Sequence, residues 1–488
     1  MSPCPTEVRG TASPVDQGAL SRALGGLAGW LESWRDADGA YNGFVVHRTE
    51  GKRMDRVHDT AWTQSAMIRG YGNLFRKSGE ARWGDAMVKA ADLLASRYDA
   101  ATGRLRHTGH EDERFQSLVS CALGVCALLS IADLVDPERR ERYVRLSEDH
   151  ARRYWLDVLW VESEGAFKFT EVDYYSHHED RFVVNFNTMA AEALLAIYEA
   201  GGDEEFRALA FRVGEWILAR WEHAQACTAR LLEGRVSVAL DPASEWMAPG
   251  AFSYQFTASR RDPDNDVTLY AGLALRGLWA LFQASGDARY EAIIRSQSGY
   301  ILAMRDPETA LFYHTAKGGI IEKNPQFIAG AGMTLLGLHE VQPLLGADAI
   351  PGETVAAILA RAYPNGSYPG FIGKNDTGLP RRDGGGVVWE DVVASVNWNA
   401  QWFEYLTRVI DRPEAIPPAP RGRSVWRVSS RFVYVDSSRK AAILSWWPPR
   451  SWGLYCYVKR RPQALVSFYP VGLYSSVRAA MVRRRGGE

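Results

Sequence analysis

Carboxylates at the starts of apolar helical segments are the residues best suited to chemistry. Asp59, flanked by His58 and Trp62, opens the first such segment, and Asp264 and Asp266 open a later one. An aspartate at a helix start is commonly a plain cap, but His58 and Trp62 are bulkier than capping requires. Clustered carboxylates repel one another, which raises the pKa of at least one and suits it to general acid catalysis. We predict catalytic roles for the three aspartates and substrate binding by His58 and Trp62, with capping as the alternative.

A second cluster, at 177–181, brings together acid, base and cation. His178 is a natural proton shuttle near neutral pH, and Arg181 can clamp a carboxylate through two hydrogen bonds. Asn187 follows at the start of the next apolar segment. We predict His178 to be catalytic and Arg181 and Asn187 to bind substrate. A merely hydrophilic loop is the alternative.

Aromatic residues accompany these polar groups. The chain has 17 Trp and 21 Tyr, and such a surplus suits a pocket that holds sugar rings, although a large helical core also absorbs aromatics. Glu390 and Asp391 precede the last apolar segment and, with its Trp398, could hold a sugar hydroxyl and an apolar ring face. Trp246 and Tyr254 lie in a long connection at 231–262, which we predict to be an ordered lid. We expect at least two of four rings to line the pocket: Trp62, Trp246, Tyr254 and Trp398.

Repeated helical hairpins must position these residues. Apolar segments rich in small residues span 60–75, 116–134, 187–199, 267–283, 326–341 and 392–410. Charged, amphipathic segments span 19–34, 81–98, 137–155, 204–221, 288–304 and 348–361. Six inner and six outer helices predict an all-α, (α/α)6 toroid. In a closed ring the inner helices begin on one face, so their N-terminal polar residues converge on one pocket.

Three of the hairpin turns share one pattern. Each has glycine, an acidic residue, two further residues and an aromatic one, starting at Gly79, Gly202 and Gly286. Glycine ends the first helix in a left-handed cap, and the acid favours the next helix start. An open solenoid is the structural rival, but six pairs without visible capping repeats favour closure into a ring.

The amino-acid composition changes after the last apolar segment. A proline-rich linker at 413–424 leads to segments at 425–435, 441–447 and 454–459 that are β-branched and aromatic. We predict a disordered or extended N-terminus at 1–18, a toroid at 19–412, the linker, and a small antiparallel β-rich appendage at 425–488.

Composition excludes several classes of function. A net charge of −1 argues against a nucleic-acid partner. The longest apolar run, 121–132, is too short to span a bilayer, and residues 1–19 show no signal peptide, so we expect a cytoplasmic protein. Five Cys without zinc spacing, and no Gly-rich phosphate loop, predict neither a metal nor a cofactor. A divalent metal near Asp264 and Asp266 stays open as a weaker alternative, because no further ligand spacing supports it. The oligomeric state stays open.

The repeat pattern and its turns resemble the six-hairpin toroid enzymes that act on carbohydrates. These are unsaturated glucuronyl hydrolases, N-acylglucosamine epimerases and the toroid domains of polysaccharide lyases, and the resemblance covers about 19–412. The lyases' Asn-Asn-His is not reproduced; Asn185-Phe186-Asn187 is only suggestive. The resemblance implies a glycoside hydrolase or lyase whose small-molecule or oligosaccharide substrate includes uronic-acid-bearing glycans.

A second resemblance gives a competing hypothesis. The stretch from Asp59 to Trp62 is similar to an Asp-Thr-Ala-Trp motif of class II diterpene cyclases, and 264–268 partly matches their Asp-x-Asp-Asp-Thr acid motif. Asp266 would then protonate a prenyl substrate, but Val267 stands where the second paired aspartate belongs. A non-catalytic glycan-binding toroid is a third hypothesis. Under the first, Asp59 and Asp266 face each other across one cavity and divide acid and base roles.

Overall fold

The computed structural model describes most of the helical part of the chain and the strands around it. The described residues are 16–32, 35, 39–47, 54–58, 62–106, 117–171, 181–233, 255–257, 261–262, 266–317, 320–346, 349–363, 365–372, 396–411, 413, 416, 424–427, 432–437, 440–447, 451–458 and 466–467.

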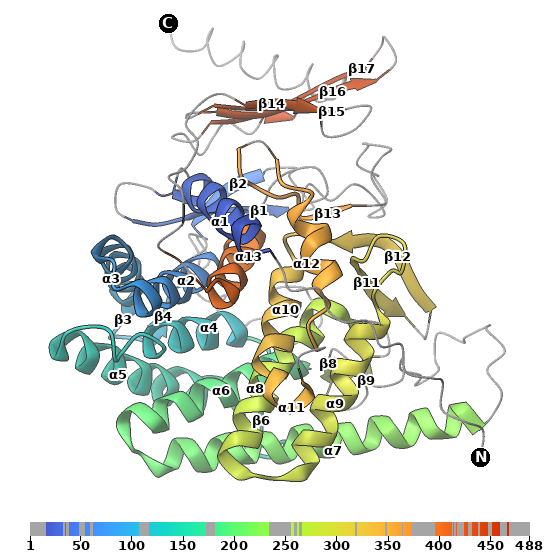
Figure 1. Cartoon of the computed structure of the whole chain (residues 1–488). Coiled ribbons are helices and arrows are strands. Elements are labelled where there is room, and N and C mark those ends of the chain that lie inside the picture. Colours follow the sequence, from blue (N-terminus) through green and yellow to red (C-terminus); the bar gives the residue numbers. More distant parts are fainter. Residues whose placement is uncertain are drawn as a thin grey trace, which may run out of the picture.

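Six inner helices form a closed ring. They are α2 (Trp62–Ser78), α4 (Leu118–Leu129), α6 (Val184–Gly201), α8 (Thr268–Ser285), α10 (Ala331–Glu340) and α13 (Val396–Val409). Each packs against the next along the chain, and α13 packs back against α2 (Figure 1). The predicted single ring is therefore confirmed, and an open solenoid is excluded. Helices α2 and α8 are first and fourth in this order and lie on opposite sides.

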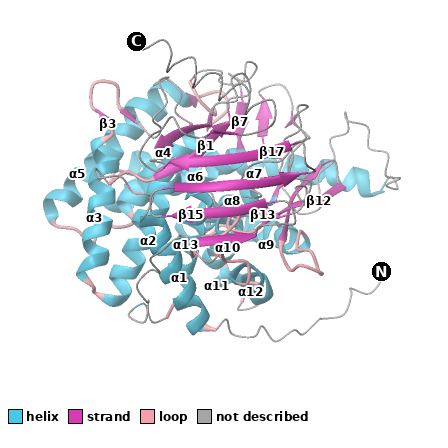
Figure 2. Ribbon diagram, turned by 90° about the horizontal axis from the view of Figure 1, so that it is seen from above, coloured by secondary structure: helices cyan, strands magenta, loops and turns pink. Residues whose placement is uncertain are grey.

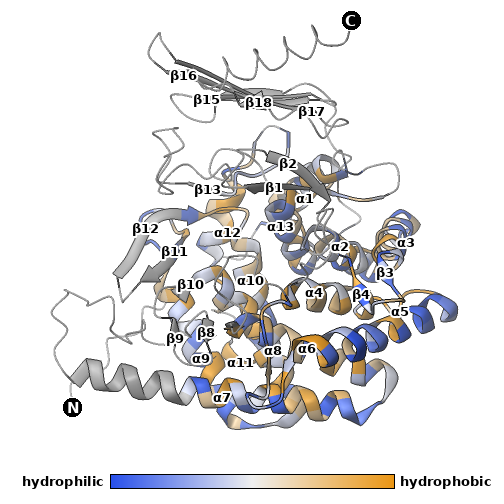
Figure 3. Cartoon of the chain, turned by 180° about the vertical axis from the view of Figure 1, so that it is seen from behind, coloured by the Kyte–Doolittle hydropathy of each residue, from blue (hydrophilic) through white to orange (hydrophobic). Residues whose placement is uncertain are grey.

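Outer helices surround the ring. They are α1 (Gln17–Glu32), α3 (Ala81–Ser96), α5 (Pro137–His150) continued by the π-helical η1 (Ala151–Leu159), α7 (Glu204–Glu233), α9 (Ala288–Ala303) and α12 (Gly352–Leu359). A short helix, α11 (Gln342–Leu345), follows α10. Helices α3, α5, α7 and α9 pack on α2, α4, α6 and α8, while α1 packs on α13 and α12. Figure 3 shows blue, hydrophilic residues concentrated on outer helices such as α5 and α7.

Glycine lets the inner helices approach closely. A Cβ on Gly277 of α8 would overlap the backbone of Thr188 in α6. On the other side of α8, a Cβ on Gly272 would overlap the backbone of Thr334 in α10. These contacts explain why the inner segments are rich in small residues, since larger side chains would force the ring apart.

The three predicted turns form as expected. Gly79, Gly202 and Gly286 have φ of 68°, 82° and 67°, and each amide donates to the carbonyl four residues back. The aromatic residue of each turn is buried in the core: Trp83, Phe206 and Tyr290. Such short turns join inner to outer helices at the C-terminal end of the ring.

The connections into the inner helices are longer and carry short strands, which the nearly all-helical prediction missed. Two-stranded pairs are β1 (Asn42–His47) with β2 (Met54–His58), β3 (Tyr98–Asp99) with β4 (Arg104–Leu105), and β5 (Trp160–Val161) with β6 (Ala166–Phe167). A three-stranded sheet contains β7 (Arg181–Val183), β8 (Gln255–Thr257) and β9 (Arg261–Asp262). A four-stranded sheet contains β10 (Asp266–Val267), β11 (Phe312–Lys317), β12 (Ile320–Phe327) and β13 (Phe371–Ile372). Most of these strands are too short for their periodicity to be visible in the sequence.

A five-stranded antiparallel sheet follows the toroid. It contains β14 (Ser424–Arg427), β15 (Phe432–Ser437), β16 (Lys440–Trp447), β17 (Ser451–Val458) and β18 (Val466–Ser467) in sequential order. Figure 1 shows it as a separate layer beyond β1 and β2, and Figure 2 looks down on its strands, with β15 and β17 labelled. The predicted β-rich appendage therefore exists. The predicted bounds, with a toroid at 19–412, a linker at 413–424 and an appendage at 425–488, remain a prediction.

No helix among the described residues is both long and apolar enough to cross a membrane.

Candidate functional site

Two segments that the sequence analysis singled out lie directly before α8 and α2. Asp266 lies in β10, directly before α8, where its backbone pairs with that of Ala316 in β11. On the opposite side of the ring, β2 ends at His58 and α2 begins at Trp62. The fold thus places these two segments at the same end of the ring.

Several predicted residues cannot be placed as side chains. Seven lie outside the described residues: Asp59, Asp264, His178, Trp246, Tyr254, Glu390 and Asp391. For three others, His58, Arg181 and Asp266, the structure describes the backbone strand alone. Their roles stay predictions.

Asn187 has a structural role that corrects the expected substrate contact. It is fully buried, and its Nδ2 donates to the carbonyls of Phe167 and Val183 at 2.9 and 3.1 Å. Its Oδ1 accepts from the Phe167 amide at 2.9 Å. Asn399 of α13 makes the same pair of bonds to the backbone of Tyr368, both at 2.8 Å. Both amides bind strands and loops to inner helices, and both donors of Asn187 are already used.

Two predicted aromatic residues lie at inner-helix starts. Trp62 and Trp398 are both half-buried against the core. The ring of Trp398 lies 6.3 Å from that of Phe327, which in turn lies 5.2 Å from the imidazole of His314. The described part of this end therefore offers aromatic surface, while the lining of a sugar pocket by two or more predicted rings remains a prediction.

His314 is a candidate that the sequence analysis missed. It lies in β11, two residues before Ala316, which pairs with Asp266. An imidazole titrates near neutral pH and a carboxylate somewhat lower, so the two strands bring two groups suited to proton transfer to the start of α8. A histidine within a short alternating strand gives little signal unless the pairing of β10 with β11 is known.

Unpaired polar groups occupy the N-terminal halves of four inner helices. Both amide atoms of Asn185 are buried without a hydrogen-bond partner. The same holds for Ser65 Oγ, Thr334 Oγ1 and Gln401 Oε1. A buried polar atom without a partner costs about 1–3 kcal/mol, so such groups ordinarily bond a ligand or ordered water. They come from α6, α2, α10 and α13 and fit a polar interior inside the N-terminal end.

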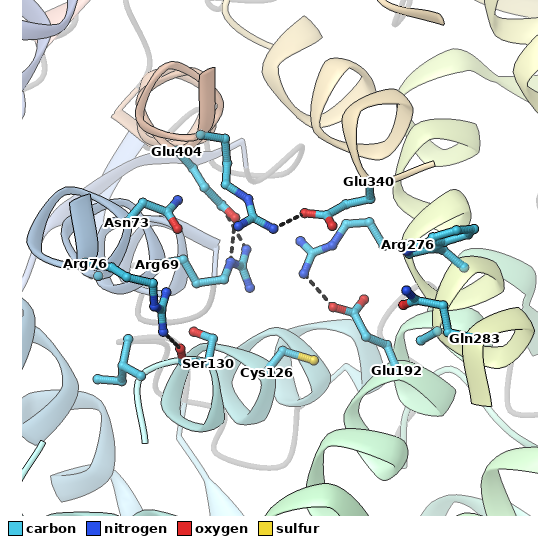
Figure 4. A pocket seen from close by; sticks show the side chains of 15 residues that line it. Arg69, Asn73, Arg76, Cys126, Ser130, Glu192, Arg276, Gln283, Glu340 and Glu404 are labelled. Carbon is cyan, nitrogen blue, oxygen red and sulfur yellow. Dashed lines mark hydrogen bonds and ion pairs between the residues drawn. The ribbon is translucent and has the colours of Figure 1, made fainter. Parts of the chain in front are cut away.

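A charged cavity of about 300 Å³ lies at the other end of the ring (Figure 4). Arg69 binds Glu404 through two bonds, Nε to Oε1 at 2.6 Å and Nη2 to Oε2 at 2.9 Å. Arg276 Nη2 binds Glu192 Oε1 at 2.6 Å. These four residues lie about two turns into their helices and form an ion-pair layer across the ring. A third pair, Arg408 with Glu340, lies nearer the helix C-termini.

Opposite charges favour the ionised forms of two groups of this cavity, Arg276 and Glu340. Burial acts to lower the pKa of Arg276, but the nearby carboxylates of Glu192, Glu404 and Glu340 outweigh it and raise that pKa. Burial acts to raise the pKa of Glu340, but the Arg408 guanidinium outweighs it and lowers that pKa. The neighbouring opposite charges thus compensate the desolvation of Arg276 and of Glu340.

The sequence analysis missed this layer, although a signal exists. Arg69, Glu192, Arg276 and Glu404 are each an isolated charge about two turns into an apolar segment. A charge in the middle of an apolar helix must find a partner, and in a ring the partner comes from a neighbouring helix.

Comparisons with known proteins agree with this architecture. The model of the N-acylglucosamine 2-epimerase family matches residues 43–245, which include α2, α4 and α6. A D-mannose isomerase superposes with a TM-score of 0.58 at 9% identity, over 83% of this chain and 99% of that chain. The fold is the (α/α)6 toroid, and this isomerase has it too.

Two further solved structures extend the likeness. Cellobiose 2-epimerase from Bacillus thermoamylovorans B4167 superposes with a TM-score of 0.53 at 12% identity, over 78% of this chain and 95% of that chain. Unsaturated glucuronyl hydrolase from Bacillus sp. GL1 gives 0.51 at 15% identity, over 80% and 96%. No curated protein sequence matches the chain significantly. The resemblance to carbohydrate-active toroid enzymes is confirmed, whereas these matches give no support to a terpene cyclase.

Proposed function

We propose that this carbohydrate-processing toroid binds its substrate at the N-terminal end of the ring and acts on it by proton transfer between opposite walls. The observation that carries the proposal is the closed ring, which sets the start of α8, with Asp266, across from the start of α2. The unpaired amide of Asn185 and the half-buried ring of Trp398 supply polar and apolar contacts of the kind that a sugar needs.

The finer assignment that we propose is a glycoside hydrolase or lyase acting on a uronic-acid-bearing oligosaccharide. Asp59 and Asp266 divide the work, the more buried carboxyl donating a proton and the more solvated carboxylate acting as base or electrostatic stabiliser. The inner-helix N-termini add partial positive charge, which favours an anionic sugar. Support comes from the polar helix starts and from the hydrolase fold likeness.

A sugar epimerase is the second candidate, because the matching family model is that of N-acylglucosamine 2-epimerases. Epimerisation next to a carbonyl removes a proton from one face of a carbon and returns one to the other. His314 on β11 and a group on the α2 wall would suit those two transfers. Terpene cyclisation and non-catalytic glycan binding remain outcomes that the assay below can reveal.

One substrate panel separates these activities. A hydrolase consumes the ring double bond of an unsaturated uronyl disaccharide, so the ultraviolet absorbance of that bond falls. A lyase forms such a double bond from a saturated polyuronide, so the absorbance rises. An epimerase interconverts D-glucose and D-mannose units and, in D2O, incorporates deuterium at the reacting carbon. Geranylgeranyl diphosphate tests the cyclase. Turnover of a sugar substrate that is lost in Asp266→Asn supports the proposal; turnover of the prenyl substrate alone overturns it.

A further inference from the structure

The cavity at the C-terminal end of the ring is separate from the proposed catalytic end. Its walls come from the last turns of inner helices, through Arg76, Gln283, Glu340 and Arg408. Its inner end is the ion-pair layer in the middle of the ring. Figure 4 shows Arg69 and Arg276 projecting into the central space from opposite sides.

Two atoms of the layer have no partner. The Arg69 side chain is 10% exposed, and its Nη1 is buried without a hydrogen bond even though Nε and Nη2 both bind Glu404. Glu192 uses Oε1 for Arg276 and leaves the buried Oε2 unpaired. A donor and an acceptor thus remain on the cavity wall, each at a cost that a ligand with matching groups would remove.

The charge of the cavity excludes a strongly ionic ligand. Arg69, Arg276 and Arg408 are matched by Glu404, Glu192 and Glu340. Arg76, at the rim, binds Asp133 at 2.9 Å and the carbonyl of Ser130 at 3.1 Å. No net charge is left for an anion or a cation to neutralise, so a ligand that ionises would lose hydration without gaining a counter-charge.

Hydroxyl groups can hydrogen-bond both kinds of unpaired atom, the guanidinium nitrogen and the carboxylate oxygen. A hydroxyl accepts from a guanidinium and donates to a carboxylate, so a polyol offers the kind of partner that each atom lacks. The indole of Trp279, half-buried in the wall, supplies an apolar face. A volume of about 300 Å³ lies at the lower end of the range for small-molecule sites, which suits a ligand no larger than one sugar ring.

We propose that this cavity is a second ligand site, which takes a neutral polyol the size of a monosaccharide and does not take part in the chemistry at the N-terminal end.

Filling the cavity tests the proposal without removing any ion pair. Ala280 lines the cavity, and Ala284, on the same helix, does not. Isothermal titration calorimetry of the full chain with D-glucose, and separately with inorganic phosphate, compares the parent with Ala280→Leu and Ala284→Leu. We expect the glucose affinity of one site to fall at least tenfold in Ala280→Leu and to be retained in Ala284→Leu. Glu192→Gln, checked for folding by circular dichroism, should lose the same site.

The outcomes separate this site from the proposed function. Glucose binding that is unaffected by Ala280→Leu but lost in Asp266→Asn would place it at the N-terminal end and overturn the second site. Phosphate binding that Ala280→Leu abolishes would overturn the neutral-ligand assignment. If neither glucose nor phosphate binds in this cavity, the cavity holds only water and the proposal is overturned. If Ala280→Leu weakens glucose binding but the parent protein turns over no sugar substrate, this inference is supported and the proposed function fails.

Discussion

The two ends of the ring are built differently. At the C-terminal end, short glycine turns join the helices, and most charged groups of the cavity are paired within the protein. At the N-terminal end, the connections are long enough to form strands, and several buried polar groups have no partner. Under the proposed function, the charged groups at the C-terminal end mainly stabilise the ring, whereas the unpaired groups at the N-terminal end are available to a substrate, because groups already saturated by their neighbours cannot bind and activate one.

Removing the carboxylate of Asp266 should give the largest effect and should affect activity alone. Loss of general acid–base catalysis typically lowers the rate by about 10²–10⁴, so Asp266→Asn should lose most turnover with little change in stability. Asp59→Asn should behave similarly. The matched control is Asp287→Asn in the turn before α9, where Asn can keep the cap. Steady-state kinetics with full activity in both variants would refute the assignment of the two aspartates.

Breaking the ion-pair layer should instead lower the stability of the ring. Arg69→Met leaves Glu404 buried and uncompensated, at a cost of about 3–5 kcal/mol in the free energy of unfolding. The double variant Arg69→Met/Glu404→Leu should recover much of that loss, because no charge remains buried. The control is Glu141→Gln, whose partner Arg145 is 72% exposed and which should change stability by less than about 1 kcal/mol. Urea denaturation measures all four, and a harmless Arg69→Met would contradict the structural role of the layer.

The N-terminal end should loosen in acid through His150. Its Nδ1 hydrogen-bonds the Gly103 carbonyl at 2.7 Å, beside β4, and its Nε2 accepts from Trp155 Nε1 at 3.1 Å. Burial lowers the pKa of His150 from 6.5 to about 4. Below about pH 6.5 the His150 imidazole binds a proton in the unfolded chain but not in the folded chain. Stability is therefore lost as the pH falls from about 6.5 to about 4, by at most about 3 kcal/mol.

The measurement is the free energy of unfolding between pH 4 and 7 in the parent and in His150→Gln. Glutamine can keep one of the two hydrogen bonds but does not titrate, so the variant should be less stable at pH 7 and show a flatter dependence on pH. Equal slopes for the two proteins would mean that His150 does not bind its proton as its burial requires.

The sequence predicted the ring better than the site, for a physical reason. Inner and outer helices differ in composition over many residues, and glycines such as Gly202 mark the turns, so the periodicity and the closure could be inferred. A site depends on which side chains are already used by neighbours. Asn187 at a helix start suggested a substrate contact, yet its donors bind Phe167 and Val183. Arg69 was not singled out, although it lies at the centre of the ring.

The smallest expected effect tests how the short turns stabilise the C-terminal end. In the turn before α9, Asp287 Oδ1 accepts from the Arg289 amide at 2.8 Å, whereas the equivalent Glu80 before α3 makes no side-chain cap. Asp287→Ala should therefore cost about 1 kcal/mol, the usual value of an N-cap, and Glu80→Ala should cost only a few tenths through its exposed pair with Arg82. Thermal unfolding of both variants measures the difference. Equal shifts would show that the acid acts through its charge at the helix N-terminus, since Glu80 and Asp287 share that charge but not the hydrogen bond.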